Sequence, residues 1–583
     1  MRIAYVSVKN YRNIDGIEVF FDPDCNYIIG ENNIGKSNFL ALLTTITNGR
    51  SFTDDDFENP ENPIEVEFHL TLLEQEYGFL GDVFSPEDSS IVKLRYYQEI
   101  TDASPSVLCI DTNESLNTRK LKKINFLKYE TTSLPSRELR LDSQKGTGLV
   151  VSRIIEQFAN GNSSGYLNDV QISKLMDFIN DHLSRLRGFR DYDIKATIAA
   201  DPVDMLTGLF YLSDGNRKID STGSGIQYMA MASINVLSQI MELFNNKSTP
   251  FEQLLYTGDS GKRFLPLVLA IDEPEVHLHP YLQRSLLGNY KRILRNEDPD
   301  FVELLKICFD IDGLDGQLIV VTHSTDALIG DYRNLIRFYR MGGKCSVVSG
   351  FILQPSQSAT NKGKLTIENE KHLLMHFPEI KEAFYSKCAL IIEGETEYGC
   401  MQSFGNKIGI SLDDNGICVI NARGEESIKP IRELLCLFKI PSVALYDGDV
   451  KSKSNLFSDA FFTNEICFEA KIVRTLLNNC KQDLVRKIAF ERDQNYEKAI
   501  MDQDMVRRPF VKMGEDLVTY IPKRLADVDD NDQVDFFRMF TTWFIVKKGI
   551  ILGRIIGELL PAELVPACYT NAILRAKEVA NNE

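Results

Sequence analysis

An apolar run that ends in clustered carboxylates is the feature of this sequence most suggestive of chemistry. In ALIIEGETEYG (389–399), Glu393 directly follows the run, and Glu395 and Glu397 come within the next four residues. Like charges at this spacing repel each other, and a buried carboxylate needs a compensating partner. Gly394 permits a tight turn that folds Glu397 back beside Glu393. The segment therefore indicates a place where cations are bound.

A second acidic segment follows another apolar run further along the chain. In SVALYDGDV (442–450), Asp447 and Asp449 flank a glycine. The carboxyl ends of parallel strands meet at one edge of an α/β sheet, so we expect these two carboxylates to converge with Glu393 and Glu397. Carboxylate oxygens suit Mg²⁺ or Mn²⁺, and two such ions can activate water and stabilise the leaving oxygen at a phosphodiester. The alternative is two unrelated acidic loops.

A phosphate-binding loop is predicted near the start of the chain. Residues 30–37 read GENNIGKS, which fits G-x-x-x-x-G-K-[ST], with an apolar strand before the motif and helical spacing after it. Backbone N–H groups would wrap the phosphates, Lys36 would reach the outer phosphates and Ser37 would ligate Mg²⁺. The residues predicted to hold ATP here are Gly30, Asn33, Gly35, Lys36, Ser37 and Asn38.

Two later apolar strands end in residues that fit an ATP site. LVLAIDEPEVHLHP (267–280) delivers Asp272, which can hold Mg²⁺ through water, and Glu273, which can orient the attacking water. LIVVTHS (318–324) ends in His323, which could sense the γ-phosphate. An acidic loop and a capped structural histidine are the alternative interpretations of these two strand ends.

The order of these motifs resembles the ABC-type ATPase heads of the SMC, Rad50 and RecF group. STGSGIQY (221–228) lies between the phosphate-binding loop and the D-E strand, and YRNIDG near the N-terminus looks like the group's opening strand. The resemblance implies that Ser221, Gly223 and Ser224 act on ATP bound by a partner subunit, and hence that the heads dimerise. No sustained heptads occur, so we expect a compact head with a small helical insert, about 145–205, as a dimerisation element.

The carboxylate pair resembles the TOPRIM domain of topoisomerases, primases and certain nucleases. GICVINARG (416–424) fits the middle strand of that fold, and Glu395 falls at a variable position, so we leave it out of the metal set. An ATPase head followed by TOPRIM is the architecture of the OLD (overcoming lysogenisation defect) family, which includes the nuclease subunit of the Gabija anti-phage system.

The OLD resemblance implies metal-dependent DNA cleavage, often in phage defence, by dimers or tetramers that work alone or with a helicase-like or other accessory protein. It makes Glu469 in ICFEAKIV (466–473) a candidate metal ligand, although a surface glutamate is the alternative. It also implies a lysine that steadies the transition-state phosphate, for which WFIVKKGIILGRI offers Lys547 or Lys548; we favour Lys548, before Gly549.

Composition sets bounds on these interpretations. The 583 residues carry a net charge of −18, which argues against a uniformly basic nucleic-acid-binding surface but not against a local basic channel, for which TRKLKK and VRRPFVK are candidates. No apolar run is long enough to span a membrane, and the scattered cysteines suit a reducing cytoplasm. We expect an α/β protein with an ATPase domain (1–350), a linker (351–385) and a TOPRIM domain with a helical C-terminal part (386–583).

The leading hypothesis is an ATP-regulated, Mg²⁺- or Mn²⁺-dependent DNA endonuclease. Its catalytic set would be Glu393, Glu397, Asp447, Asp449, Glu469 and Lys548, with Glu273 serving ATP turnover. Two alternatives remain: a non-cleaving, ATP-switched DNA clamp whose acidic site holds a structural cation, and a RecF-like repair or recombination factor.

Overall fold

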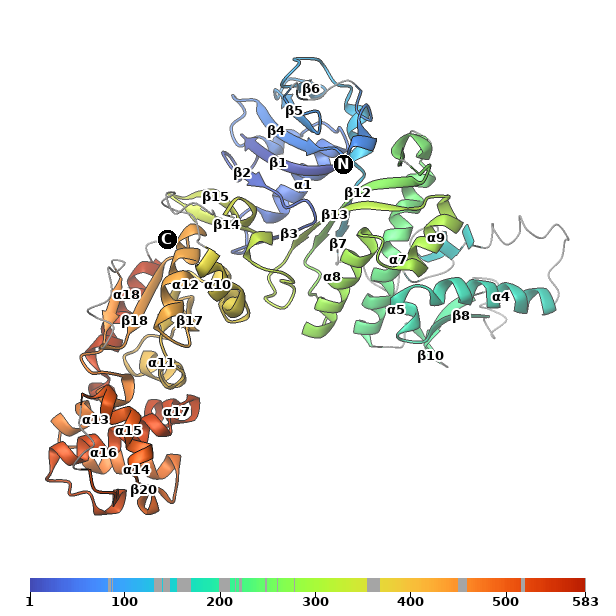
Figure 1. Ribbon diagram of the computed structural model, residues 1–583. Helices are drawn as coiled ribbons and strands as arrows, with labels where there is room; N and C mark the ends of the chain where they lie inside the picture. The colour runs from blue at the N-terminus through green and yellow to red at the C-terminus, as the bar shows by residue number, and fades with distance from the viewer. Residues whose placement is uncertain are drawn as a thin grey trace. The chain divides into compact units, whose positions relative to one another are not determined.

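The computed structural model divides the chain into two compact units, Met1–Ile352 and Leu353–Glu583 (Figure 1). It describes all residues except 82–84, 86, 131–138, 140–146, 152, 155–168, 199–209, 215–216, 220–222, 247–248, 259, 277, 354–366, 449–458, 515–519 and 582–583. Ser221 and Asp449, both predicted site residues, therefore lie outside the description. In the described part of the chain, no helix has the length and apolar character needed to cross a membrane.

The first unit opens with an antiparallel sheet in the order β2-β1-β4-β5-β6. Alternating apolar and polar residues explain this sheet: in IEVEFHLT the apolar residues are buried and the polar ones are half-exposed or exposed, which is typical of a strand with one face on a core. The strands are β1 (Arg2–Lys9), β2 (Glu18–Phe20), β4 (Ile64–Thr71), β5 (Ile91–Gln98) and β6 (Ser106–Cys109).

The central sheet of the first unit positions the ATP motifs. Its order is β11-β12-β13-β3-β14-β15, with β7 paired to β12, and all neighbours from β7 through β14 are parallel. β13 is buried along its whole length, as in parallel sheets covered on both faces. The strands are β3 (Cys25–Gly30), β7 (Phe126–Glu130), β11 (Tyr256–Thr257), β12 (Arg263–Asp272), β13 (Gly313–Val321), β14 (Leu335–Met341) and β15 (Lys344–Ser349).

Helices cover this sheet, and they follow the ATP motifs along the chain. α1 packs on β3 and β7, α8 and α9 pack on β13, and α7 packs on α8. The helices are α1 (Lys36–Thr47), α7 (Ser224–Phe244), α8 (Pro280–Leu294) and α9 (Pro299–Phe309).

The predicted helical insert is only partly helical. Within 145–205 the structure places α4 (Asp169–Ser184) and α5 (Arg187–Arg190), but then β8 (Ile194–Ile198), which pairs with β9 (Phe210–Asp214) and through it with β10 (Arg217–Lys218). The Asn180 side chain ties β8 to α4 by accepting from the Ala196 amide (2.7 Å) and donating to the Ala196 carbonyl (2.9 Å). This small α+β element extends beyond the expected boundary, and its role in dimerisation stays a prediction.

The second unit begins with a parallel sheet in the order β17-β16-β18-β19. Short, wholly apolar runs form the strands, and β16 is buried at every position. The elements are β16 (Cys388–Ile392), α11 (Glu395–Lys407), β17 (Ile417–Asn421), α12 (Glu425–Leu437), β18 (Ser442–Tyr446) and β19 (Ala460–Phe462). The second parallel α/β unit predicted from strand–helix alternation is thus present.

Part of the predicted linker belongs to this second unit. Residues 354–366 lie outside the description, but α10 (Ile367–Ile380) packs against α12, and the 3₁₀ turn Lys381–Tyr385 packs against α10 and β17. The ring of Phe384 meets that of Phe438 edge-on at 5.0 Å, and His376 hydrogen-bonds Ser427 (3.1 Å). The apolar residues of HLLMHFPEI recur at helical spacing, a signal that the polar composition of the preceding stretch conceals.

A helical assembly completes the second unit (Figure 1). The buried Trp543 belongs to its hydrophobic core. The members of the assembly are α13 (Phe468–Asn478), α14 (Gln482–Arg492), α15 (Gln503–Lys512), α16 (Gln533–Val546) and α17 (Ile550–Leu559), with the short strands β20 (Ile500–Met501) and β21 (Lys523–Arg524). The last helix, α18 (Ala567–Asn581), returns to pack on the sheet.

Glycines let α17 cross directly over α11. A Cβ at Gly553 would lie 1.9 Å from the Thr396 carbonyl oxygen, and one at Gly399 would lie 2.4 Å from the Ile550 carbonyl oxygen. Only glycine fits at both positions, so the backbones touch. This contact fixes the start of α17, and the loop before it, against the start of α11.

Candidate active sites

The two acidic strand ends meet, as the sequence predicts. β16 and β18 are adjacent and parallel, with Ile392 paired to Leu445. Glu393 comes directly after β16, and Asp447 comes directly after Tyr446, the last residue of β18. Both therefore lie at one sheet edge, and the Asp447 backbone amide donates to Glu393 Oε2 at 3.0 Å. Asp447 is buried and Glu393 is half-buried.

Glu397 is held on both carboxylate oxygens by protein groups. Oε2 accepts from the Gly394 amide (2.9 Å), which caps the start of α11, and Oε1 accepts from the Tyr569 hydroxyl (2.7 Å) of α18. Burial raises the pKa of Glu397, and the charges of Glu393 and Glu469 add to the rise. Tyr569 is a site residue that the sequence analysis misses, because nothing in ACYTNAILRAK marks a tyrosine that contacts a glutamate so far away.

Glu469 joins the same neighbourhood from the first turn of α13. It is buried, and its Oε1 accepts from the Thr396 hydroxyl at 2.7 Å. Thr396 in turn accepts from the Gly549 amide at 3.1 Å, which brings the loop before α17 to the start of α11. The surface alternative for Glu469 is therefore wrong, and Thr396 is the connecting residue that the sequence did not reveal.

Lys548 is exposed in that loop and lines the same pocket as the carboxylates. Its neighbour Lys547 does not line the pocket and instead pairs with Asp493 at 3.2 Å. Of the two lysines considered, the structure therefore places Lys548 at the site.

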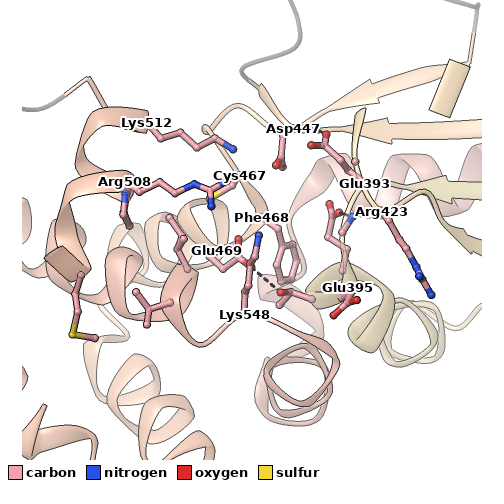
Figure 2. A pocket seen from close by; sticks show the side chains of 18 of the residues that line it. Glu393, Glu395, Arg423, Asp447, Cys467, Phe468, Glu469, Arg508, Lys512 and Lys548 are labelled. Carbon is pink, nitrogen blue, oxygen red and sulfur yellow. Dashed lines mark hydrogen bonds between the residues drawn. The ribbon is translucent and has the colours of Figure 1, made fainter. Parts of the chain in front are cut away.

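The pocket at this sheet edge has a volume of about 710 Å³. Figure 2 shows Glu393 and Asp447 on one side and Arg508 and Lys512 reaching in from the other. The lining side chains that can carry charge are Glu393, Glu395, Glu397, Arg423, Asp447, Glu469, Asp504, Arg508, Lys512 and Lys548.

One carboxylate oxygen of Asp447, Oδ1, is buried without a hydrogen-bond partner among the described residues. Burial raises the pKa of Asp447, and the charges of Glu397 and Glu393 raise it further. A buried carboxylate in this state is stabilised by a proton or by a bound cation.

A divalent cation fits the donor chemistry of the pocket. Hard carboxylate oxygens are what Mg²⁺ and Mn²⁺ prefer, and Asp447 Oδ1 is one such oxygen left over. Among the described residues, however, no three histidine, cysteine, aspartate or glutamate side chains are grouped so as to hold an ion as they stand. The carboxylates of Glu397 and Glu469 instead accept hydrogen bonds from the Tyr569 and Thr396 hydroxyls. Asp449 lies outside the described residues.

The phosphate-binding loop of the first unit has the backbone geometry of its motif. Gly30 and Gly35 have φ of 142° and 117°, values that strain any residue with a side chain. Asn33 shares the left-handed region with φ of 58°. Ser37 is exposed in the first turn of α1.

Lys36 folds back onto its own loop. Its Nζ donates to the carbonyls of Gly30 (2.9 Å) and Glu31 (2.5 Å), and burial lowers its pKa to about 8. Two hydrogen bonds hold the Asn38 side chain: its Oδ1 accepts from the Arg12 guanidinium at 2.8 Å, and its amide nitrogen donates to Asn13 Oδ1 at 2.7 Å.

The D-E strand and the histidine strand end beside each other. β13 lies between β12 and β3, so Asp272, His323 and the phosphate-binding loop share one sheet edge. His323 Nε2 is 3.7 Å from Glu273 Oε1, and Glu273 has a left-handed φ of 51°. Burial lowers the pKa of His323, and the charge of Lys36 lowers it further. Lys128 of β7 brings its Nζ to 3.8 Å from Asp272 Oδ2, and no sequence motif marks this neighbour.

Glu275 is a second residue missed in the ATP site. Its carboxylate accepts from the Thr322 hydroxyl (2.8 Å) and from the His323 amide (2.5 Å). It therefore fixes the loop that carries His323. The repeated acid of D-E-P-E was the available signal.

The Ser/Gly segment begins a helix. Gly223 is exposed and precedes α7, which starts at Ser224. Nothing in a single chain tests contact with a partner's ATP, so the roles of Ser221, Gly223 and Ser224 stay predictions.

Comparisons with known proteins match both units. The family model described as AAA ATPase domain matches residues 1–148 and 150–327, and that of the overcoming lysogenization defect protein-like TOPRIM domain matches residues 384–449. The Old nuclease of Escherichia phage P2 is 21% identical over 509 residues, covering 78% of each chain. The uncharacterized protein YbjD of Escherichia coli K12 is 23% identical over 543 residues, covering 83% of each chain.

A solved structure of the C-terminal region of the Xanthomonas campestris pv. campestris OLD protein is also similar. It shares 15% identity and a TM-score of 0.23, covering 34% of this chain and 97% of that chain. The family matches confirm the predicted order of an ATPase followed by TOPRIM. The chain belongs to the AAA ATPase domain family over more than half its length and, with its OLD-like TOPRIM domain, is a member of the OLD family of ATPase–TOPRIM proteins.

Proposed function

We propose that the protein is an ATP-regulated endonuclease that hydrolyses DNA phosphodiester bonds with the help of divalent cations. The observation that carries the proposal is the meeting of Glu393 and Asp447 at neighbouring strand ends, with Asp447 Oδ1 buried and unpartnered within the described chain. The OLD-like TOPRIM match and the similarity to a named nuclease support it.

The carboxylates would hold Mg²⁺ or Mn²⁺, two ions in the fullest form of the proposal. Glu393 and Asp447 are the primary ligands, and Asp449, Glu397 and Glu469 are the further candidates. Bound divalent cations supply the activation of water and the stabilisation of the leaving oxygen. The protein's own part is to orient these oxygens: the Asp447 amide holds Glu393, Tyr569 holds Glu397, and Thr396 holds Glu469.

Lys548 would contact the phosphate that is cut. It is exposed, lines the pocket, and is carried by a loop whose Gly549 amide is tied to Thr396. A fixed cation at this point can stabilise the charge that develops on the phosphate oxygens in the transition state.

ATP would regulate the nuclease through the first unit. Lys36, Ser37 and Asp272 would bind nucleotide and its Mg²⁺, with Glu273 and His323 beside the γ-phosphate. From the family resemblance we further propose homodimers or homotetramers, action in the cytoplasm in anti-phage defence, and an accessory protein as a partner.

A metal-dependent cleavage assay tests the proposal. Supercoiled plasmid is incubated with wild type, Glu393→Gln or Asp447→Asn in Mn²⁺ or Mg²⁺, with and without ATP, and nicked and linear products are counted. Asp414→Asn, an exposed carboxylate outside the pocket, is the matched control. We expect cleavage by wild type and the control alone. Equal cleavage by Asp447→Asn would contradict the assigned site.

One observation favours a non-cleaving, ATP-switched DNA clamp as the second candidate. Asp447 Oδ1 is buried without a hydrogen-bond partner among the described residues, and one structural cation beside it and Glu393 would satisfy it. The same assay separates the two, since a clamp retains plasmid in the presence of ATP and leaves it intact.

A further inference from the structure

One face of α15 forms the wall of the pocket opposite the carboxylates. Asp504, Arg508 and Lys512 follow each other at intervals of four residues, which places them on one side of the helix. All three line the pocket, whereas Arg507, next in sequence to Arg508, does not. Figure 2 shows Arg508 and Lys512 extending from this helix toward the side that holds Asp447.

The side chains of Arg508 and Lys512 are accessible to solvent, although they line a pocket. The structure shows no ion pair for Arg508 within the described part of the chain, even though Asp504 lies one helical turn away. Lys512 acts across the pocket on Asp447, where its charge opposes the rise in pKa that burial causes.

Two acidic residues of the sheet edge face two basic residues of α15 across the pocket, although Asp504 also lies on the α15 face. Glu393 and Asp447 stand at the sheet edge, and Arg508 and Lys512 stand on the helical side. Cations bound at the carboxylates would attract one phosphate of a nucleic-acid strand, and the next phosphates along the strand would be left to protein side chains. Arginine and lysine are the usual partners for such backbone contacts.

We propose that Arg508 and Lys512 bind the DNA backbone at phosphates neighbouring the one that is cut, and so position the strand across the carboxylate site. They are positioning residues, since the reaction itself is assigned to the other wall. This inference rests on the proposed function for its choice of DNA. In VRRPFVK, Arg508 and Lys512 therefore face the substrate, whereas Arg507 faces solvent.

A binding experiment tests the inference without requiring cleavage. All variants are made in the Asp447→Asn full-length protein, and affinity for a fluorescein-labelled DNA duplex is measured by anisotropy across a salt series in EDTA. Arg508→Ala and Lys512→Ala should each weaken binding about tenfold, the worth of one charge-assisted contact. The slope of log affinity against log salt should become shallower by about 0.9 for each contact removed.

Arg507→Ala is the matched control, with the same residue type, helix and exposure. It should bind as its parent does. Equal affinities for Arg507→Ala and Arg508→Ala, or equal losses in both, would overturn the inference, as would the absence of measurable binding by the parent. Tighter binding of a matched RNA duplex would overturn the assignment to DNA. Thermal melting of each variant shows that it is folded, and Arg508→Lys should recover most of the affinity if the fold tolerates no alanine.

Cleavage kinetics separate this inference from the proposed function. In the otherwise unaltered protein, Arg508→Ala should raise KM for plasmid with little change in kcat. Selective loss of binding in a protein that cuts no DNA would leave Arg508 and Lys512 as residues that bind the DNA backbone and would remove the nuclease proposal. Normal KM in Arg508→Ala alongside active cleavage would remove this inference alone.

Discussion

The backbone amide of Asp447 donates to the carboxylate of Glu393 at 3.0 Å, so one acidic strand end is the hydrogen-bond donor that fixes the other. Two residues that repel each other through their side chains are thus joined through a main-chain contact. The contact orients Glu393 before any cation is present. It also separates the structural role of Glu393, as an acceptor, from its chemical role, as a charge.

The first prediction uses this separation. Glu393→Gln keeps an oxygen that can accept from the Asp447 amide, so we expect near-normal stability and loss of cleavage. Glu393→Ala leaves that amide without its acceptor and should lower the free energy of unfolding by about 1–3 kcal/mol. Urea denaturation measures the difference. Equal stability of the two variants would show that the contact contributes nothing to the fold.

The second prediction concerns pH. The pKa of Glu397 is raised from 4.5 to about 8 and that of Asp447 from 3.8 to about 10, in both cases mainly by burial. Between the ordinary and the raised values the folded protein holds protons that the unfolded chain has released, so raising the pH favours unfolding. Without divalent cations the free energy of unfolding should fall from pH 5 to pH 8.5.

Divalent cations should reverse that fall. They bind the deprotonated carboxylates, so the stabilisation by Mg²⁺ should grow with pH over the same range. Thermal melting at several pH values, with Mg²⁺ or with EDTA, measures both effects. The double variant Glu397→Gln, Asp447→Asn should show a flatter pH profile and little response to Mg²⁺. A wild-type profile with the same slope as this variant would contradict the assignment.

The sequence predicts the residues at the strand ends well, but it predicts poorly the residues that hydrogen-bond the site carboxylates. Glu393, Asp447, Asp272 and His323 stand where apolar runs end, and a buried parallel strand leaves little freedom in where its next residue lies. Tyr569 and Thr396 act across elements that are distant in sequence, and no local pattern encodes such a contact. Glu469 was found only through the family resemblance, and its partner was not.

The third prediction concerns Lys128, whose ammonium lies 3.8 Å from the Asp272 carboxylate. A fixed positive charge there competes with Mg²⁺ for the same oxygens. Lys128→Met should therefore lower the Mg²⁺ concentration needed for ATP binding by about fivefold or more, because a charge pair at this distance is worth about 1 kcal/mol even when water screens it fully. A fluorescent ATP analogue titrated with MgCl₂ measures it, and Lys128→Arg, which keeps the charge, is the control. An unchanged Mg²⁺ requirement in the methionine variant would contradict the competition.

The fourth prediction tests how Lys548 is positioned. A methyl group at Gly553 would meet the Thr396 carbonyl oxygen at 1.9 Å, so Gly553→Ala must move α17 away from α11. Forced overpacking of this kind costs about 1–3 kcal/mol of stability. Because the Gly549 amide holds Thr396, and Thr396 holds Glu469, the same shift should loosen the loop of Lys548 and reduce cleavage beyond the loss in stability.

The matched control for this helix crossing is Gly409→Ala. Gly409 has φ of 75°, but no atom of the described residues lies within 4 Å of an added Cβ, so its replacement strains the backbone without moving α17. Urea denaturation gives the stability of both variants, and plasmid cleavage at a temperature where both are folded gives their activity. The crossing of α11 and α17 holds the loop that contains Lys548, and Gly409 is not part of this crossing. Cleavage should therefore fall in Gly553→Ala and persist in Gly409→Ala. Equal activity in the two folded variants would show that this crossing does not position the lysine.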